Sequence, residues 1–108
     1  MPPTAGSAGE WIERGKACSR SGDHEQALAC YVRAVEAAPV SAEAYLFLCN
    51  ELKELGRYQE AIECYNKALK IDPASCQLWI NKGNTLVKLR REDEAMECFD
   101  RARRTRKR

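Results

Sequence analysis

Apolar side chains recur along this chain at intervals of three and four residues, a spacing that places them on one face of an α-helix. In the middle of the chain, one such stripe consists of Tyr45, Leu48, Leu52 and Leu55. After a short polar interruption a second stripe follows, formed by Ala61, Ile62, Tyr65, Ala68 and Leu69. Because each stripe needs a partner to bury it, the pattern predicts two packed helices joined by a turn.

The same pattern returns every 34 residues. The residues that coincide at this offset are Ser7, Ser41 and Ser75; Trp11, Tyr45 and Trp79; Ala27, Ala61 and Ala95; Cys30, Cys64 and Cys98; Tyr31, Tyr65 and Phe99; Ala34, Ala68 and Ala102; and Pro39 with Pro73. A period of this length is typical of proteins in which each repeat is a helix-turn-helix and neighbouring repeats share a core. We therefore predict three stacked units.

Residues suited to helix ends bound the predicted helices. These helices span 8–21, 24–37, 42–55, 58–71, 76–89 and 92–106. Ser7 followed by Glu10 predicts a capping box, in which each residue binds a free backbone N–H of the other. Gly22 and Gly56 suit the left-handed backbone that ends the first helix of a unit, and Asp23 is placed to cap the second.

These residues resemble the tetratricopeptide repeat family, whose units carry a large aromatic residue, a small residue four positions later, and then alanine, aromatic, alanine and proline. The second unit is most similar to this pattern and contains the segment L-G-R-Y-x-E-A-I-x-C-Y-x-K-A-L-x-I-D-P. Cys49 stands where the family usually has glycine or alanine. Other departures fall at Arg14, Cys18 and His24 in the first unit and at Lys82, Arg90 and Glu92 in the third.

The resemblance implies an all-α fold, a right-handed superhelical solenoid of three repeats. The repeats would span residues 8–41, 42–75 and 76–107, after a flexible N-terminal arm at 1–7 and with a basic tail at 101–108 that overlaps the last helix. In the third unit, Arg103 and Thr105 replace the apolar Leu69 and Ile71 of the second. Because the end of a helical array needs a polar outer face, we expect the third unit to cap the array.

In proteins similar to this one, the first helix of each unit lines a concave groove that accepts an extended or helical peptide. Carried onto this chain, the groove residues are Ile12, Glu13, Lys16, Leu46, Phe47, Asn50, Ile80, Asn81, Asn84 and Lys88. Ile12, Leu46 and Ile80 are one repeat apart, and Phe47 lies beside the middle one. Because exposed apolar strips usually mark contact surfaces, we predict that a partner covers this one. The alternative is that these side chains thicken the core of a small array.

Asn50 and Asn84 are also one repeat apart. An asparagine amide can donate to and accept from a peptide backbone without selecting a side chain, although an idle solvated face would have the same composition. Chaperone-binding members of the family clamp a C-terminal carboxylate with lysines, arginine and asparagines. The corresponding places here hold Ile12, Lys16, Phe47, Gln77 and Asn81. The clamp is absent, so binding of the chaperone tail is not predicted.

Charge is distributed unevenly along the chain. Residues 101–108 hold six of the 18 basic residues and no acidic one, although the formal net charge is only +2. The remaining residues therefore carry a net charge of −4, which argues against a nucleic-acid-binding face spread over the fold. The basic tail either contacts nucleic acid, an acidic membrane surface or an import receptor, or simply stabilises the C-terminal end of the last helix.

The sequence offers little for catalysis or metal binding. His24 is the only histidine, and no serine or cysteine lies in a recognisable nucleophile context. Cys30, Cys64 and Cys98 are in register, but packed helices lie roughly 10 Å apart, whereas thiolate ligands approach one zinc ion within about 2.3 Å. We expect no enzymatic activity, no cofactor and no metal, and six reduced thiols.

No apolar run approaches the roughly 20 residues of a membrane-spanning helix, and the first nine residues lack the basic and apolar regions of a leader peptide. We therefore expect a cytoplasmic protein. The predicted function is that of an adaptor or scaffold that binds a peptide or helix of a protein partner. The alternatives are a homo-oligomer formed through the groove and contact of the basic tail with an acidic surface or nucleic acid, of which nucleic acid is not the expected partner.

Overall fold

The structure, a computed structural model, describes residues 6–106. Most of the predicted N-terminal arm and the last two residues of the predicted basic tail lie outside the described residues. Within the described range the chain forms six α-helices and no strand. The helices are α1 (Ala8–Arg20), α2 (His24–Ala37), α3 (Ala42–Glu54), α4 (Tyr58–Ile71), α5 (Cys76–Lys88) and α6 (Glu92–Arg106). Each predicted boundary is correct to within one residue.

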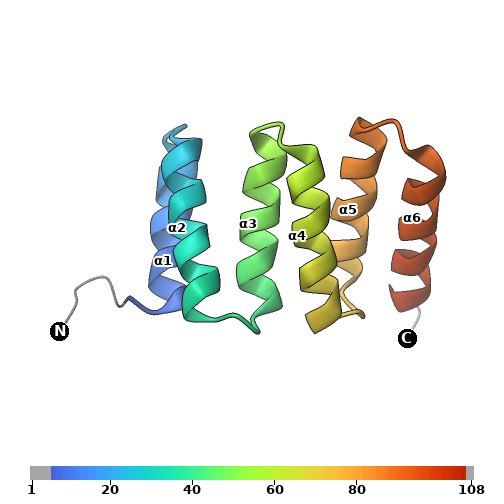
Figure 1. The fold of residues 1–108 in the computed structure, drawn as a ribbon. Helices are drawn as coiled ribbons and strands as arrows, with labels where there is room; N and C mark the ends of the chain where they lie inside the picture. Colours follow the sequence, from blue (N-terminus) through green and yellow to red (C-terminus); the bar gives the residue numbers. More distant parts are fainter. Residues whose placement is uncertain (1–5, 107–108) are drawn as a thin grey trace.

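The six helices stand side by side in chain order, and consecutive helices run in opposite directions (Figure 1). Consecutive helices pack on one another along the whole array. In addition the backbone of α3 lies close to the backbones of α1 and α5, whereas the backbones of the second helices, α2, α4 and α6, lie farther from one another. The first helices are therefore the more closely spaced layer, and the array curves towards them. This all-α solenoid of three helical hairpins confirms the predicted fold class.

Side chains cap the N-terminal ends of α1, α2, α3 and α5, as the sequence predicts. The backbone N–H of Glu10 donates to Ser7 Oγ over 3.1 Å, and the backbone N–H of Ser7 donates to Glu10 Oε1 over 2.9 Å, which completes the capping box. Ser41 and Ser75 accept the corresponding bonds at the starts of α3 and α5, and Asp23 does so for α2. The caps occupy backbone donors that have no partner inside the helix.

The turn inside each unit needs one residue with left-handed backbone. Gly22 and Gly56 fill this position with φ of 85° and 78°, a conformation that glycine adopts without strain. In the third unit Arg90 occupies the same place with φ of 62°. The fold therefore imposes the turn even where the sequence supplies an unfavourable residue.

Small residues allow the two helices of each unit to pack closely. Ala27, Ala61 and Ala95 are almost completely buried between the helices of their units, as the sequence predicts. In the first unit the ring of Tyr31 lies directly over Gly15, so that a β-carbon added to the glycine would be 2.4 Å from the ring. Close packing of this kind gives each hairpin a rigid shape, which in turn holds the surface of the first helices in place.

Candidate functional site

All ten predicted groove residues lie on the first helices of the units, α1, α3 and α5, which form the more closely spaced layer of the array. Because the array curves towards this layer, the layer presents the inner surface. The structure brings some of the ten residues together across neighbouring units. It buries at least one of them in the core.

Phe47 on α3 is the centre of one cluster. Its ring stacks on that of Tyr31, with 5.6 Å between ring centroids and 25° between ring planes. The ammonium group of Lys16 lies 5.1 Å from the Phe47 centroid and also donates to Glu13 over 3.3 Å. Three of the predicted residues thus meet where the first and second units join, with Phe47 half-buried among them.

The predicted exposed apolar strip is wrong at Ile12. Ile12 is 7% exposed and packs in a core cluster with Ala27 and Ala44. Leu46 is half-buried against the core of the second unit, and Ile80 is half-buried on α5. Ile12 is buried because Ala27 and Ala44 are small. They let the neighbouring helices approach closely enough for the Ile12 side chain to pack between them. The alternative, that these side chains thicken the core, is correct for Ile12.

Asn50 has specific partners inside the protein. Its side-chain oxygen accepts the Tyr65 hydroxyl over 2.5 Å and the side-chain amide of Asn81 over 3.2 Å. Asn81 in turn uses its backbone carbonyl to accept the hydroxyl of the buried Thr85. Asn50 therefore pairs with Asn81 of the next unit, whereas the contact of Asn50 and Asn84 with a peptide backbone stays a prediction. The side-chain amide of Asn50 donates no bond among the described residues.

Two hollows lie at the C-terminal ends of the first helices. One encloses about 510 Å³ and is lined by Lys16, Ser19, Arg20 and Tyr31. The other encloses about 300 Å³ and is lined by Lys53, Glu54, Tyr58, Asn84 and Lys88. Both combine a tyrosine with two basic side chains, and the second also contains Glu54, so the lining of each hollow has a net positive charge.

Sequence reasoning missed the contact between His24 and Glu51. His24 Nδ1 lies 2.5 Å from Glu51 Oε2, and Glu51 is only 4% exposed. The pair joins the start of α2 to the last turn of α3 and thus links the first unit to the second. The sequence contains one indication of this contact. Glu51 falls on the same helix face as Leu48 and Leu55, and a charge on a buried face needs a partner.

The cysteines of the described chain are free thiols. Burial is the main cause that raises the pKa of Cys49, and it also raises the pKa of Cys30 and of Cys98. Residues 6–106 contain no group of three side chains that could hold a metal ion. No helix in this range is both long enough and apolar enough to cross a membrane.

Three family models match consecutive parts of the chain. Models described as tetratricopeptide repeats match residues 8–51 and 77–102, and a model described as TPR repeat matches residues 50–89. The chain belongs to the tetratricopeptide repeat family. Together the three matches cover residues 8–102 without a gap. The comparison with curated proteins found no match.

Solved structures similar to this tetratricopeptide repeat protein include MamA, with a TM-score of 0.90 and 25% identity over 95% of this chain and 60% of the MamA chain. The chain thus spans about three fifths of MamA. The TPR2B domain of yeast Sti1, in a complex with pHsp70, has a TM-score of 0.87 and 28% identity over 91% of this chain and 78% of that one. The second TPR of Spaghetti (RPAP3), bound to an HSP90 peptide, has a TM-score of 0.83 and 22% identity over 88% of each chain.

Proposed function

We propose that this protein is an adaptor whose inner surface, formed by α1, α3 and α5, binds a peptide or helix of a protein partner. The observation that carries the proposal is the curvature of the array towards these three helices. A curved layer surrounds a segment lying across it, so one bound peptide can contact all three units at once.

The chemistry of the inner surface supports a peptide ligand. Phe47 offers a half-buried aromatic ring that Tyr31 holds in place, and such rings often anchor binding interfaces. The free side-chain amide of Asn50 can donate to a peptide carbonyl, because its oxygen is already held by Tyr65. Both groups are fixed by contacts within the protein, which lowers the entropy lost on binding.

The similar domain of yeast Sti1 provides an independent argument, because it is known in a complex with pHsp70. We extend to this chain only the general role, that of holding a protein partner. The clamp positions of chaperone-binding relatives are not reproduced here, so we do not propose a chaperone tail as the ligand.

Substitution of Asn84 by glutamate tests the proposal. Asn84 is exposed on α5 and lines the hollow beside Lys88, so the change adds a negative charge to the hollow without disturbing the core. Proteins that co-purify with the wild-type chain from cells should be lost from this variant, as measured by quantitative mass spectrometry. A second variant, Phe47→Ala, should weaken binding of the same proteins.

The matched control is Glu63→Lys on α4. Glu63 is exposed and belongs to a second helix, so it lies outside the layer of first helices. This variant should keep all of the partners. If the two groove variants keep them as well, while remaining folded by circular dichroism, the inner surface is not the binding site.

A further inference from the structure

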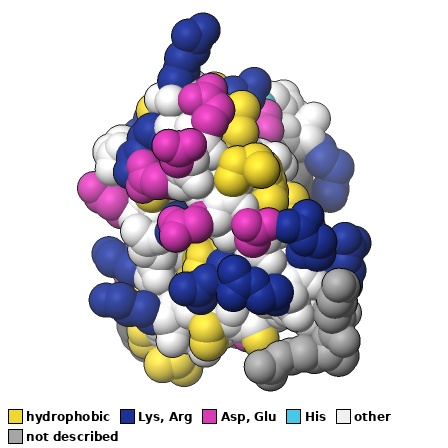
Figure 2. Space-filling model, turned by 90° about the vertical axis from the view of Figure 1, so that its right-hand side faces the viewer, with side chains coloured by type: hydrophobic (Ala, Val, Ile, Leu, Met, Phe, Trp, Pro, Cys, Tyr) yellow, Lys and Arg dark blue, Asp and Glu magenta, His cyan; other side chains and the backbone are white. Residues whose placement is uncertain are grey.

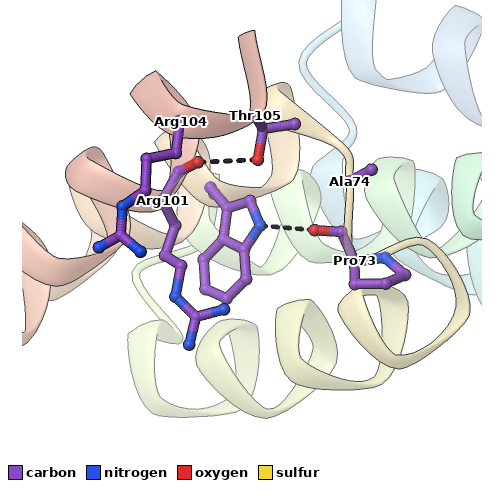
Figure 3. A pocket seen from close by; sticks show the side chains of 6 residues that line it. Pro73, Ala74, Arg101, Arg104 and Thr105 are labelled. Carbon is purple, nitrogen blue, oxygen red and sulfur yellow. Dashed lines mark hydrogen bonds between the residues drawn. The ribbon is translucent and has the colours of Figure 1, made fainter. Parts of the chain in front are cut away.

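We propose that a pocket between the α4–α5 turn and the second half of α6 binds the phosphate group of a phosphorylated protein segment. The pocket encloses about 320 Å³ and is lined by Pro73, Ala74, Trp79, Arg101, Arg104 and Thr105 (Figure 3). None of the ten predicted groove residues lines it. The pocket is therefore a second surface, independent of the proposed peptide groove.

No ion pair neutralises the arginines of the pocket, although Arg101 shares an adjoining hollow with Glu94 and Glu97. No carboxylate is among the lining residues of the pocket itself, and the exposed Arg101 and Arg104 form no ion pair within residues 6–106. Three other arginines, Arg57, Arg91 and Arg103, each pair with a carboxylate three residues away. Two arginines three residues apart on one helix, neither of them in an ion pair, form an attractive site for an anion.

Trp79 holds one of these groups in position. Its indole N–H donates to the carbonyl of Pro73 over 2.8 Å, which fixes the ring beside the turn (Figure 3). The guanidinium carbon of Arg101 lies 5.2 Å from the centroid of that ring. A guanidinium group held against a fixed ring has lost much of its freedom, yet its N–H groups at the edge can still donate. Donors prepared in this way bind an oxyanion at a small entropic cost.

The helix dipole does not explain why a basic residue stands at position 101. The dipole favours cations only in the last turn of a helix, and Arg101 lies five residues before the last helical residue, Arg106. Glu97 is four residues before Arg101 and well placed for an ion pair on the helix surface. The side chain of Arg101 lies over Trp79 and forms no such pair.

The combination of residues is specific to the third unit. At the place of Arg104, the first unit has an acidic residue, Glu36. At the place of Thr105, the second unit has the exposed apolar Ile71. The stacking of an arginine on a tryptophan does recur in the first unit, where the guanidinium carbon of Arg33 lies 5.5 Å from the Trp11 centroid. Neither of the other units, however, combines two arginines with a hydroxyl group at these places.

A phosphate group fits this pocket better than a carboxylate. At neutral pH a phosphorylated side chain carries a charge of about −1.5 to −2, which matches two guanidinium groups, and its three oxygens allow paired hydrogen bonds to each of them. The apolar surface of Trp79 and Pro73 can contact the carbon atoms that carry the phosphate.

The rest of α6 favours an isolated phosphate over a nucleic acid. Acidic side chains gather over the upper part of this end of the molecule, and basic side chains gather below them (Figure 2). The first half of α6 contains Glu92, Asp93, Glu94 and Glu97. These carboxylates would repel the neighbouring phosphates of a polynucleotide, whereas they would attract basic residues beside a single phosphorylated residue.

The test uses a seven-residue peptide with blocked ends, one central phosphoserine flanked by alanines, and a lysine near each end. Binding to the full chain is followed through the indole N–H signals of the two tryptophans by nuclear magnetic resonance. We expect the signal of Trp79 to move and saturate. The signal of Trp11, on α1 at the other end of the array, should stay in place. The unphosphorylated peptide should move neither signal.

Arg101→Ala and Arg104→Ala should each weaken binding by about tenfold or more, because each removes charged hydrogen bonds to the phosphate. Arg103→Ala is the matched control, since it removes the same charge from an exposed residue of the same helix that is paired with Asp100. It should bind nearly as the wild type does. The proposal fails if Trp79 does not respond, if both peptides act alike, if Arg103→Ala weakens binding equally, or if oligothymidylate binds more tightly than the phosphopeptide.

Discussion

At the scale of single residues, two of the three units place a glycine directly beneath an aromatic ring. A β-carbon added to Gly15 would lie 2.4 Å from the ring of Tyr31, and one added to Gly83 would lie 2.6 Å from the ring of Phe99. The second unit has the fully buried Cys49 in this place. The same position therefore holds a side chain in the second unit, whereas in the first and third units the aromatic ring fills the space that a side chain would need.

Gly15→Ala should lower the free energy of unfolding by about 1–3 kcal/mol, since the buried Tyr31 ring must shift to make room. Gly9→Ala on the same helix is the control. Its β-carbon would meet only Ser7 Oγ, at 3.8 Å, so the change should raise stability by about 0.5–1 kcal/mol through helix propensity. Urea unfolding followed by circular dichroism measures both. Equal effects of the two variants would show that the ring contact is unimportant.

At the scale of elements, each hairpin depends on one residue that ends its first helix. Glycine does this in the first two units, and Arg90 does it in the third with the same left-handed backbone. Residues with a β-carbon adopt this conformation at a cost of roughly 1–2 kcal/mol. The α5–α6 hairpin therefore carries strain that the α1–α2 and α3–α4 hairpins avoid.

Arg90→Gly should consequently raise the stability of the protein by about 1 kcal/mol. Arg90 is exposed and forms no ion pair within residues 6–106, so little else is lost. The reciprocal change, Gly56→Arg, should lower stability by a similar amount, because nothing lies within 4 Å of the added β-carbon and only the backbone is affected. Thermal unfolding of the two variants should move in opposite directions. If both variants changed the unfolding temperature in the same direction, this explanation of the turn would be wrong.

At the scale of the whole molecule, every unit buries at least one ionisable group in its core. Burial raises the pKa of Tyr31 to about 12, and it also raises the pKa of Tyr65. Burial also raises the pKa values of the Cys30, Cys49 and Cys98 thiols. All of these groups are neutral when protonated, so the folded array holds its protons more tightly than the unfolded chain does.

The array should therefore lose stability in alkaline solution. Unfolded thiols and tyrosines release their protons near pH 9 and pH 10, whereas the folded protein keeps them to higher pH. The stabilisation is complete below these values and decreases as the pH rises towards the folded pKa values. The urea midpoint should fall between about pH 8 and pH 11, and Tyr31→Phe should make the fall less steep. A midpoint independent of pH in this range would contradict the prediction.

The sequence by itself determined the three units, their helices and most of the helix ends. These features depend on local conformational preferences, which act between neighbours along the chain. They depend also on the period of 34 residues, which can be read directly from the sequence. The serine caps, the glycine turns and the close contacts at Ala27, Ala61 and Ala95 belong to this class. Each can be read from a single unit without knowing how that unit meets the next.

Only the tertiary structure decided which side chains remain on the surface. Ile12 is buried, Asn50 pairs with Asn81, and His24 meets Glu51, although the last two pairs are 31 and 27 residues apart. The phosphate pocket likewise joins the turn before α5 to the end of α6. The periodic pattern assigns a residue to a helix face, but its partners depend on how closely neighbouring helices approach and on which rotamer fills the remaining space.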